Sequence, residues 1–241
     1  MDYSEPCKYS IRLIEKLKSL DTKNILDFDL INKAIYWARK YHGEQKRKSG
    51  EPYYSHPLEV AYMISEHKLK TDVIVASILH DIIEDTEVTA GMIFDNFGQR
   101  IAQMVDRLTR DRPDGSKLSI EEVITNAYKK ADKEVLLIKL IDRLHNMQTI
   151  QYKSIEKIHN TSEQTFSFFI SLSMFLEVLT IEVKMFIICQ NLWQNSSKQL
   201  PEKDINSSFY SLKYENQSSF LSRVYQNNSD LCQKLHKLEL I

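Results

Sequence analysis

The sequence predicts an all-α fold, because three observations agree. Apolar residues recur at spacings of three and four along most of the first 150 residues, as they do on helices with one buried face. The 241 residues include only 5 Gly and 5 Pro, which is few for a fold rich in turns. No two strand-like runs are joined by a hairpin signal. A chain of this length can bury one substantial core with a small appendage.

Most of the predicted helices fall in the first 150 residues. They are expected over residues 8–20, 27–41, 57–67, 72–84, 89–97, 101–108, 119–131 and 133–148. The first rests on its apolar period alone, whereas Asp27 offers a cap for the second and Pro57 suits the first turn of the third. Asp72 stands near the start of the fourth helix, and Thr89 can cap the fifth.

Turn-forming residues separate these helices. Phe97-Gly98 is expected to stop one helix before the pattern restarts at Ile101. Residues 110–117 contain Pro113-Asp114-Gly115 and are expected to form a loop. A second loop, residues 43–55, is polar and positively charged.

Charge and cysteine content narrow the class of protein. With 32 Lys and Arg against 33 Asp and Glu, the net charge is -1, so no global basic field favours nucleic acid or a membrane surface. Cys7, Cys189 and Cys232 lie too far apart in sequence for a zinc motif or a disulfide framework, which suits a reducing cytoplasm. Asp2 and Glu5 leave no apolar stretch at the amino terminus, so no secretory signal is expected.

The carboxyl-terminal part differs from the rest. Residues 166–192 are strongly apolar, but Glu177, Glu182 and Lys184 interrupt them. Because a membrane span needs about 20 mostly uncharged apolar residues, we expect a buried or partner-facing helix and no membrane span. Residues 195–241 are rich in Asn and Ser, and we expect them to be a weakly ordered tail.

Four potential metal ligands stand out, namely His56, the adjacent pair His80-Asp81, and Asp142. The pair and Asp142 interrupt apolar runs, where a charge is costly to bury unless it is paired or bound to a cation. Two imidazoles and two carboxylates leave open positions on a six-coordinate ion, which suits manganese or iron better than zinc. The alternative is a surface Asp81 beside a hydrogen-bonded core histidine, but His56 and Asp142 in matching contexts favour the metal.

Two further groups of residues could act around such an ion. On a helix, Glu84 and Asp85 would lie close to His80 and Asp81, where they could orient or deprotonate water or protonate a leaving group. A solvated helix end is the alternative. The basic stretch 46–48 could bind phosphate or stack on a purine, or it could be an ordinary solvated loop.

The other histidines are expected at the surface or in packing. They are His42, His67, His145, His159 and His236, of which His145 is the exception to watch because Asn146 follows it.

Five blocks of the sequence, in order, resemble the hydrolase domain of the RelA/SpoT homologues, which belong to the HD superfamily of helical metal-dependent phosphohydrolases. The blocks are Gln45–Tyr53, His56–Ala61, Leu79–Thr86, Phe97-Gly98 and Ile138–Met147, within a match over roughly residues 27–190.

The resemblance implies a manganese-dependent enzyme that removes pyrophosphate from the ribose 3′ position of the guanosine alarmones ppGpp and pppGpp, leaving GDP or GTP. The implied metal ligands are His56, His80, Asp81 and Asp142. The implied catalytic residues are Glu84 and Asp85. The implied substrate-binding residues are Arg47, Lys48, Ser49, Asn146 and Thr149.

The same resemblance suggests how the chain is organised. We expect an N-terminal helix in residues 1–26, the HD hydrolase domain in 27–160, a helical connector in 161–194 and the tail in 195–241. No block resembles the synthetase domain of long family members, so a hydrolase-only protein or a fragment is expected. Apolar residues of the connector would then lack their usual partner and could drive self-association.

Two positions depart from the family pattern. Arg107 stands where the family usually has glycine, which could alter how the following loop fits the substrate. Ile141 replaces the usual alanine before the last metal ligand.

Two other functions are compatible with the sequence. One is a decayed or regulatory module that binds guanine nucleotide or metal without turnover. The other is a different HD enzyme, such as a 5′-nucleotidase or a cyclic-nucleotide phosphodiesterase, which would not be expected to share the basic loop.

Overall fold

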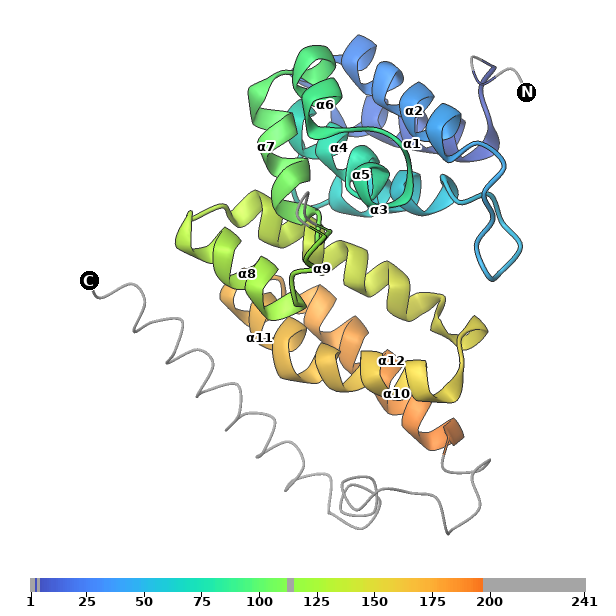
Figure 1. Cartoon of the computed structure of the whole chain (residues 1–241), viewed down its shortest axis with the longest axis vertical. Helices are drawn as coiled ribbons and strands as arrows, with labels where there is room; N and C mark the ends of the chain where they lie inside the picture. The colour runs from blue at the N-terminus through green and yellow to red at the C-terminus, as the bar shows by residue number, and fades with distance from the viewer. Residues whose placement is uncertain (1–2, 4, 112–114, 197–241) are drawn as a thin grey trace. The chain divides into compact units, whose positions relative to one another are not determined.

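The computed structural model describes residues 3, 5–111 and 115–196, and these are organised in helices (Figure 1). Within them, β structure is limited to the isolated bridges Lys46–Pro52 and Asp111–Lys117. The predicted all-α class is therefore confirmed. The chain divides into two compact units, of which one covers residues 1–145 and the other begins at Asn146. The finer division at residues 26, 160 and 194 stays a prediction.

Helices α1 to α9 account for the first unit, with α9 continuing three residues beyond its boundary. They are α1 (Lys8–Leu20), α2 (Phe28–His42), α3 (Ser55–Ile64), α4 (Thr71–Leu79), α5 (Ile82–Asp85), α6 (Ala90–Phe97), α7 (Gln99–Leu108), α8 (Ile120–Lys129) and α9 (Lys133–Gln148). The predicted caps are present, because Asp27 accepts a hydrogen bond from Leu30 N and Thr89 accepts one from Met92 N. Gly98 has φ of 84° and separates α6 from α7, where the stop was predicted.

Helix α4 is the centre of the first unit. It packs against α2, α3 and α7 (Figure 1), and each residue from Val73 to Leu79 is buried. Its apolar side chains are therefore covered on all sides, as the continuous apolar run in the sequence indicates. This burial fixes the end of α4, which leads directly into His80 and Asp81.

The predicted single helix over residues 72–84 is wrong in one respect. Helix α4 ends at Leu79, and the short helix α5 begins at Ile82. Between them, Asp81 has φ of -101° and ψ of -4°, the sparsely populated bridge region where many functional residues lie. The carbonyl of Asp81 starts α5 by accepting hydrogen bonds from the N–H groups of Glu84 and Asp85, each at 3.1 Å. Glu84 therefore does not follow His80 on one continuous helix.

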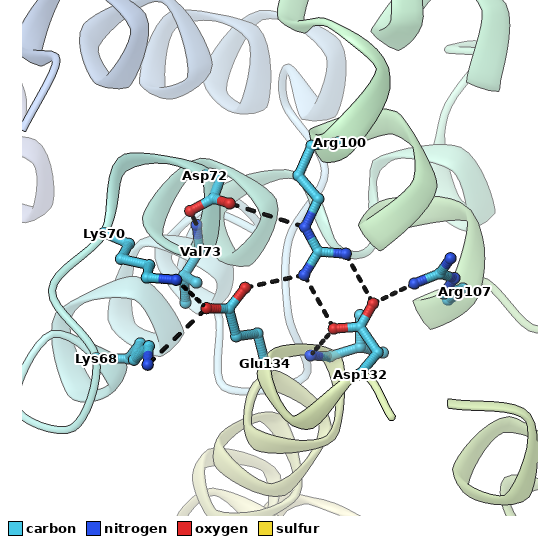
Figure 2. A network of polar contacts seen from close by, with 9 residues as sticks. Lys68, Lys70, Asp72, Val73, Arg100, Arg107, Asp132 and Glu134 are labelled. Carbon is cyan, nitrogen blue, oxygen red and sulfur yellow. Dashed lines mark hydrogen bonds and ion pairs between the residues drawn. The ribbon is translucent and has the colours of Figure 1, made fainter. Parts of the chain in front are cut away.

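An ion-pair network fixes the start of α9 (Figure 2). Asp132 lies just before α9, is 5% exposed, and accepts hydrogen bonds from Arg100 at 2.8 and 3.0 Å and from Arg107. Glu134 accepts from Lys70 at 2.7 Å and from Arg100 at 2.9 Å. The network joins α7 and the segment before α4 to the helix that carries Asp142.

Arg107, the family departure noted above, belongs to this network. Its guanidinium donates to Asp132 at the start of α9, which gives the arginine a structural contact within the network (Figure 2). The expectation that Arg107 alters substrate fit is not needed to explain the residue, because a paired guanidinium stabilises the buried carboxylate.

We expect Asp132→Ala to lower the free energy of unfolding by about 2–4 kcal/mol, because a helix cap and charged hydrogen bonds are lost together. Burial by itself would raise the pKa of Asp132, but hydrogen bonds from Arg100 and from Val135 N–H outweigh it and lower the pKa. A lowered pKa in the folded state stabilises the fold above the unfolded pKa, and this contribution disappears as the pH falls through the folded pKa. Urea unfolding at neutral and acidic pH measures both effects.

A matched control is Asp111→Ala. Asp111 forms an ion pair with Lys117 at 2.6 Å, but both side chains are about half exposed, so a loss below about 1 kcal/mol is expected. If the two alanine variants unfold at the same urea concentration, the network does not stabilise the unit.

The described part of the second unit is also helical. It comprises the 3₁₀-helix η1 (Ile150–Tyr152), α10 (Ile155–Gln164), the π-helix η2 (Thr165–Phe169), α11 (Ile170–Phe175) and α12 (Leu179–Ser196). Met147, Ile150 and Cys189 form a small buried cluster there. The apolar stretch 166–192 is divided after α11, where Glu177 has φ of 58°.

Two further observations concern this unit. In the part of the chain that the structure describes, no helix combines the length and apolar character needed to cross a membrane. Helix α12 continues to Ser196, so the first two residues of the predicted tail are helical, and residues 197–241 lie outside the described residues.

Candidate metal centre

The four predicted metal ligands meet inside the first unit. His56 comes from α3, His80 and Asp81 from the junction of α4 and α5, and Asp142 from α9. His56 Nε2 lies 3.3 Å from Asp81 Oδ2 and 3.2 Å from Asp142 Oδ1. His80 Nε2 lies 3.1 Å from Asp81 Oδ1 and 3.7 Å from Asp142 Oδ1. Two imidazole nitrogens and two carboxylates therefore converge on one point.

The hydrogen bonding of His80 favours a cation at that point. Its Nδ1 lies 2.8 Å from the carbonyl oxygen of Ser77, and a carbonyl only accepts, so Nδ1 carries a proton. The buried Nε2 makes no hydrogen bond, although the carboxylate oxygen of Asp81 is close to it. In neutral His80 this nitrogen points its lone pair at anionic oxygens, which is unfavourable unless a cation lies between them.

The ionisation of these residues agrees with a cation site. Burial lowers the pKa of His80, but Asp81 and Asp142 outweigh burial and raise it to about 10, so the site attracts positive charge. Burial would raise the pKa of Asp142, but Lys139 and the two imidazoles hold it well below its usual range. Asp142 is therefore anionic, with Lys139 Nζ 3.2 Å from its other oxygen.

The chemistry of the donor set indicates which ions fit. His56, His80 and Asp142 are buried and offer ligand atoms within 4.8 Å of one another, and Asp81 adds a second carboxylate. Two nitrogens, two oxygens and no thiolate suit a borderline or hard divalent ion with remaining open positions. The residues present thus fit a divalent metal ion.

Glu84 and Asp85 lie on α5 beside this cluster. Glu84 is half-buried, and its Oε1 accepts a hydrogen bond from the backbone N–H of Arg110. Asp85 is more exposed, and its Oδ2 accepts a hydrogen bond of 2.6 Å from the Tyr53 hydroxyl. Partial burial raises the pKa of both carboxyls. A carboxyl with a raised pKa is suited to exchanging a proton near neutral pH.

The basic loop forms a tight turn in the same unit. Arg47 N–H donates to Glu51 O at 2.9 Å, and Gly50 N–H donates to Arg47 O at 2.9 Å. Gly50 has φ of 87°, a conformation that favours glycine. Arg47, Lys48 and Ser49 therefore project from one turn, with Lys48 exposed and Ser49 Oγ 3.4 Å from a Glu51 carboxylate oxygen.

The last two predicted substrate residues belong to the second unit. Asn146 and Thr149 lie at the end of α9 and just after it, and Thr149 Oγ1 donates to Asn146 O at 3.5 Å. Their predicted role in binding the nucleotide stays a prediction.

Sequence reasoning assigned no role to several residues at the centre. His145 was the histidine to watch among those expected at the surface or in packing, and it is buried with its Nδ1 2.7 Å from His56 Nδ1. Burial, His56 and Arg47 together lower the pKa of His145 to about 3, so this imidazole is neutral. A signal was present, because Lys139 and His145 each stand three residues from Asp142 and therefore share its face of α9.

His42 is also buried, and it packs near the acidic pair. Its ring stacks on Tyr53 with 4.8 Å between centroids, and its Nδ1 lies 3.1 Å from Gln45 Oε1. Gln45 in turn donates to the backbone carbonyl of Asp85 at 2.9 Å. These contacts tie the start of the basic loop to α5.

The chain is similar in sequence to known proteins. A protein from Aquifex aeolicus, named guanosine-3′,5′-bis(diphosphate) 3′-pyrophosphohydrolase, is 34% identical over 178 residues, which cover 71% of this chain and 25% of that protein. A Myxococcus xanthus protein named GTP pyrophosphokinase is 38% identical over 167 residues, which cover 66% of this chain and 22% of that protein. The chain thus spans about a quarter of the length of these relatives.

A solved structure shows the same fold. It is described as a metazoan orthologue of SpoT that hydrolyses ppGpp, and it aligns with a TM-score of 0.50 and 22% identity over 78% of this chain and 97% of its own. These relatives confirm the resemblance inferred from the five sequence blocks. The HD domain family matches residues 34–177, a range that contains the four converging ligands. The chain therefore belongs to the HD domain family.

Proposed function

We propose that this chain hydrolyses the alarmones ppGpp and pppGpp to GDP or GTP and pyrophosphate, and so degrades the signal of the stringent response. The observation that carries the proposal is the convergence of His56, His80, Asp81 and Asp142 beside an acidic pair and a basic turn. The names of the Aquifex relative and of the SpoT-like structure point to the same substrate.

The reaction needs water to attack the inner phosphorus of the 3′-diphosphate. The P–O bond to the ribose 3′ oxygen breaks, pyrophosphate leaves with the oxygen of the water, and the 3′ oxygen takes up a proton. His56, His80, Asp81 and Asp142 would hold a cation, which would supply charge stabilisation for the phosphates and would lower the pKa of water. We infer that Mn²⁺ is this cation, because the ligand set contains two imidazoles and two carboxylates.

The acidic pair, Glu84 and Asp85, carries out proton transfer in this proposal. The raised pKa of Glu84 suits a group that accepts the proton of the attacking water and later releases it. Asp85 is already hydrogen-bonded to Tyr53, which suits a role in orientation. The protein therefore contributes positioning and electrostatic stabilisation, which suffice for phosphoryl transfer.

Substrate binding falls to the basic turn and to the residues after Asp142. The guanidinium of Arg47 can stack on the guanine or pair with phosphate, and Lys48 and Ser49 flank it. Asn146 and Thr149 would contact the nucleotide. Because this substrate is a cytosolic nucleotide and the cysteines suit a reducing compartment, we propose that the protein works in the cytoplasm.

The test is incubation of the purified chain with ppGpp, with Mn²⁺ or with a chelator, while GDP and pyrophosphate are followed. Release of both products in equal amounts, only with the metal, is the expected result. Binding of ppGpp without turnover would instead support a regulatory binding module. Turnover of 5′-mononucleotides or cyclic nucleotides in preference to ppGpp would indicate a different HD enzyme.

We also propose that the chain self-associates through its connector. Leu179, Val183 and Ile187 follow one another at spacings of four on α12 and are 66%, 46% and 48% exposed. An exposed apolar stripe of this kind is typical of a helix that packs on a partner. Sedimentation velocity should show a dimer that Val183→Lys dissociates. A monomer at micromolar concentration would contradict the proposal.

A further inference from the structure

We propose that His145 is a positioning residue that connects the metal centre to the basic loop. It would hold the imidazole of His56 in the orientation that a cation needs. The same ring nitrogen of His145, Nδ1, would also accept a hydrogen bond from Arg47 in the loop. This inference deepens the proposed function and rests on it for the identity of the substrate.

Two nitrogen atoms of other side chains face His145. Its Nδ1 lies 3.3 Å from Arg47 Nη1 and 2.7 Å from His56 Nδ1. A guanidinium has donors and no acceptor, so the nitrogen of His145 that faces it presents its lone pair. The His56 Nδ1 that faces the same lone pair must then carry the proton and donate it.

The proton on His56 Nδ1 determines whether Nε2 of the same ring has a free lone pair. With Nδ1 protonated, neutral His56 has its lone pair on Nε2, which points at the carboxylates of Asp81 and Asp142 at 3.3 and 3.2 Å. A lone pair among anionic oxygens is the arrangement of a ligand around a cation. His145 therefore selects the tautomer of His56 that can bind metal.

The two metal imidazoles are held by different means. His80 donates to the backbone carbonyl of Ser77, three residues earlier in α4, so its orientation is fixed locally. His56 depends on a side chain 89 residues away in sequence, and that side chain also contacts Arg47 in the basic loop. The rings of His56 and His145 lie 4.8 Å apart with 33° between their planes. One ring nitrogen thus serves both the metal centre and the substrate loop.

The experiment compares two substitutions of His145 by measuring Mn²⁺ binding to the whole chain by calorimetry, with no nucleotide present. His145→Phe keeps a ring but removes the acceptor, and we expect Mn²⁺ affinity to fall about 10- to 100-fold, the usual cost of losing such a partner. His145→Asn places an amide oxygen near the position of Nδ1 and should stay within a few-fold of the wild type. His67→Phe is the matched control, because His67 is a partly buried histidine of the first unit that is not among the residues of the metal centre, and the Mn²⁺ affinity of this variant should not change.

Two outcomes would overturn the inference. One is unchanged Mn²⁺ affinity in His145→Phe. The other is an equal loss in His145→Asn and His145→Phe when both are folded by circular dichroism, since a missing acceptor would then not be the cause.

A second measurement needs no substitution. Nitrogen-15 spectra of the histidine rings of the wild-type chain, loaded with diamagnetic Zn²⁺, report which nitrogen carries the proton. We expect His56 protonated on Nδ1 and His145 on Nε2, and the reverse assignment for His145 would overturn the proposal. Neither experiment uses ppGpp, so an absence of alarmone hydrolysis with these results in place would refute the proposed function and leave the role of His145 intact.

Discussion

Replacing Asp81 with alanine is expected to reduce ppGpp hydrolysis to the level seen with a chelator. The carboxylate of Asp81 lies 3.3 Å from His56 Nε2 and 3.1 Å from His80 Nε2, so it faces both imidazoles of the metal centre. Its removal takes away one of four ligands and half of the negative charge that attracts the cation. We expect a loss in kcat/KM of at least about a thousandfold, which corresponds to about 4 kcal/mol of transition-state stabilisation.

Calorimetry with Mn²⁺ and product analysis after incubation with ppGpp measure the two consequences. Asp95→Ala is a suitable control, because Asp95 is an exposed aspartate on α6, and it should bind metal and turn over substrate like the wild type. Asp81→Asn keeps the size of the side chain and separates loss of charge from loss of packing. Normal Mn²⁺ binding and normal turnover in Asp81→Ala would refute the assignment of the metal centre.

Much of the first unit could be predicted, because local signals and tertiary structure agree there. Asp27 and Thr89 cap the helices that they were predicted to cap, and the period of apolar residues places α4 in the core. The ligands were recognisable because polar residues that interrupt apolar runs need a partner. His80 and Asp81 also fit the family pattern in order and spacing.

The break between α4 and α5 could not be predicted from such signals. No Gly or Pro stands between Thr71 and Asp85, and the apolar period continues through this stretch. The backbone leaves the helix at Asp81, where two imidazoles from different elements meet its carboxylate. That requirement comes from the assembled site, so it has no local marker in the sequence.

Contacts between residues that are distant in the sequence could not be predicted either. His145 contacts His56, and Arg107 contacts Asp132. The residues next to His145 and Arg107 in the sequence do not indicate these contacts. Periodicity gives the face of a helix on which a residue lies, but it does not give the element that packs there. For this reason the sequence marked His145 as the histidine to watch but indicated no partner for it, and it predicted only that Arg107 could alter substrate fit.

Replacing Glu84 with glutamine is expected to leave the metal in place and remove most of the rate. Glutamine keeps the shape of the side chain and an oxygen that can accept the hydrogen bond from Arg110 N–H, but it cannot take up a proton. We therefore expect Mn²⁺ affinity within a few-fold of the wild type and a fall in kcat of about 10²- to 10⁴-fold, the usual contribution of a general base.

The dependence of kcat on pH separates this role from a structural one. Burial and the negative charge of Asp81 raise the pKa of Glu84, while the hydrogen bond from Arg110 opposes them. In the wild type, kcat should fall as the pH drops through this raised pKa, because a protonated carboxyl cannot accept the proton of water. Glu84→Gln should lose this dependence along with the rate, whereas Glu87→Gln, which alters an exposed residue, should keep both. If Glu84→Gln instead loses Mn²⁺ and keeps the pH dependence, Glu84 is a metal ligand and the proton acceptor lies elsewhere, with Asp85 and its hydrogen bond from Tyr53 as the next residue to change.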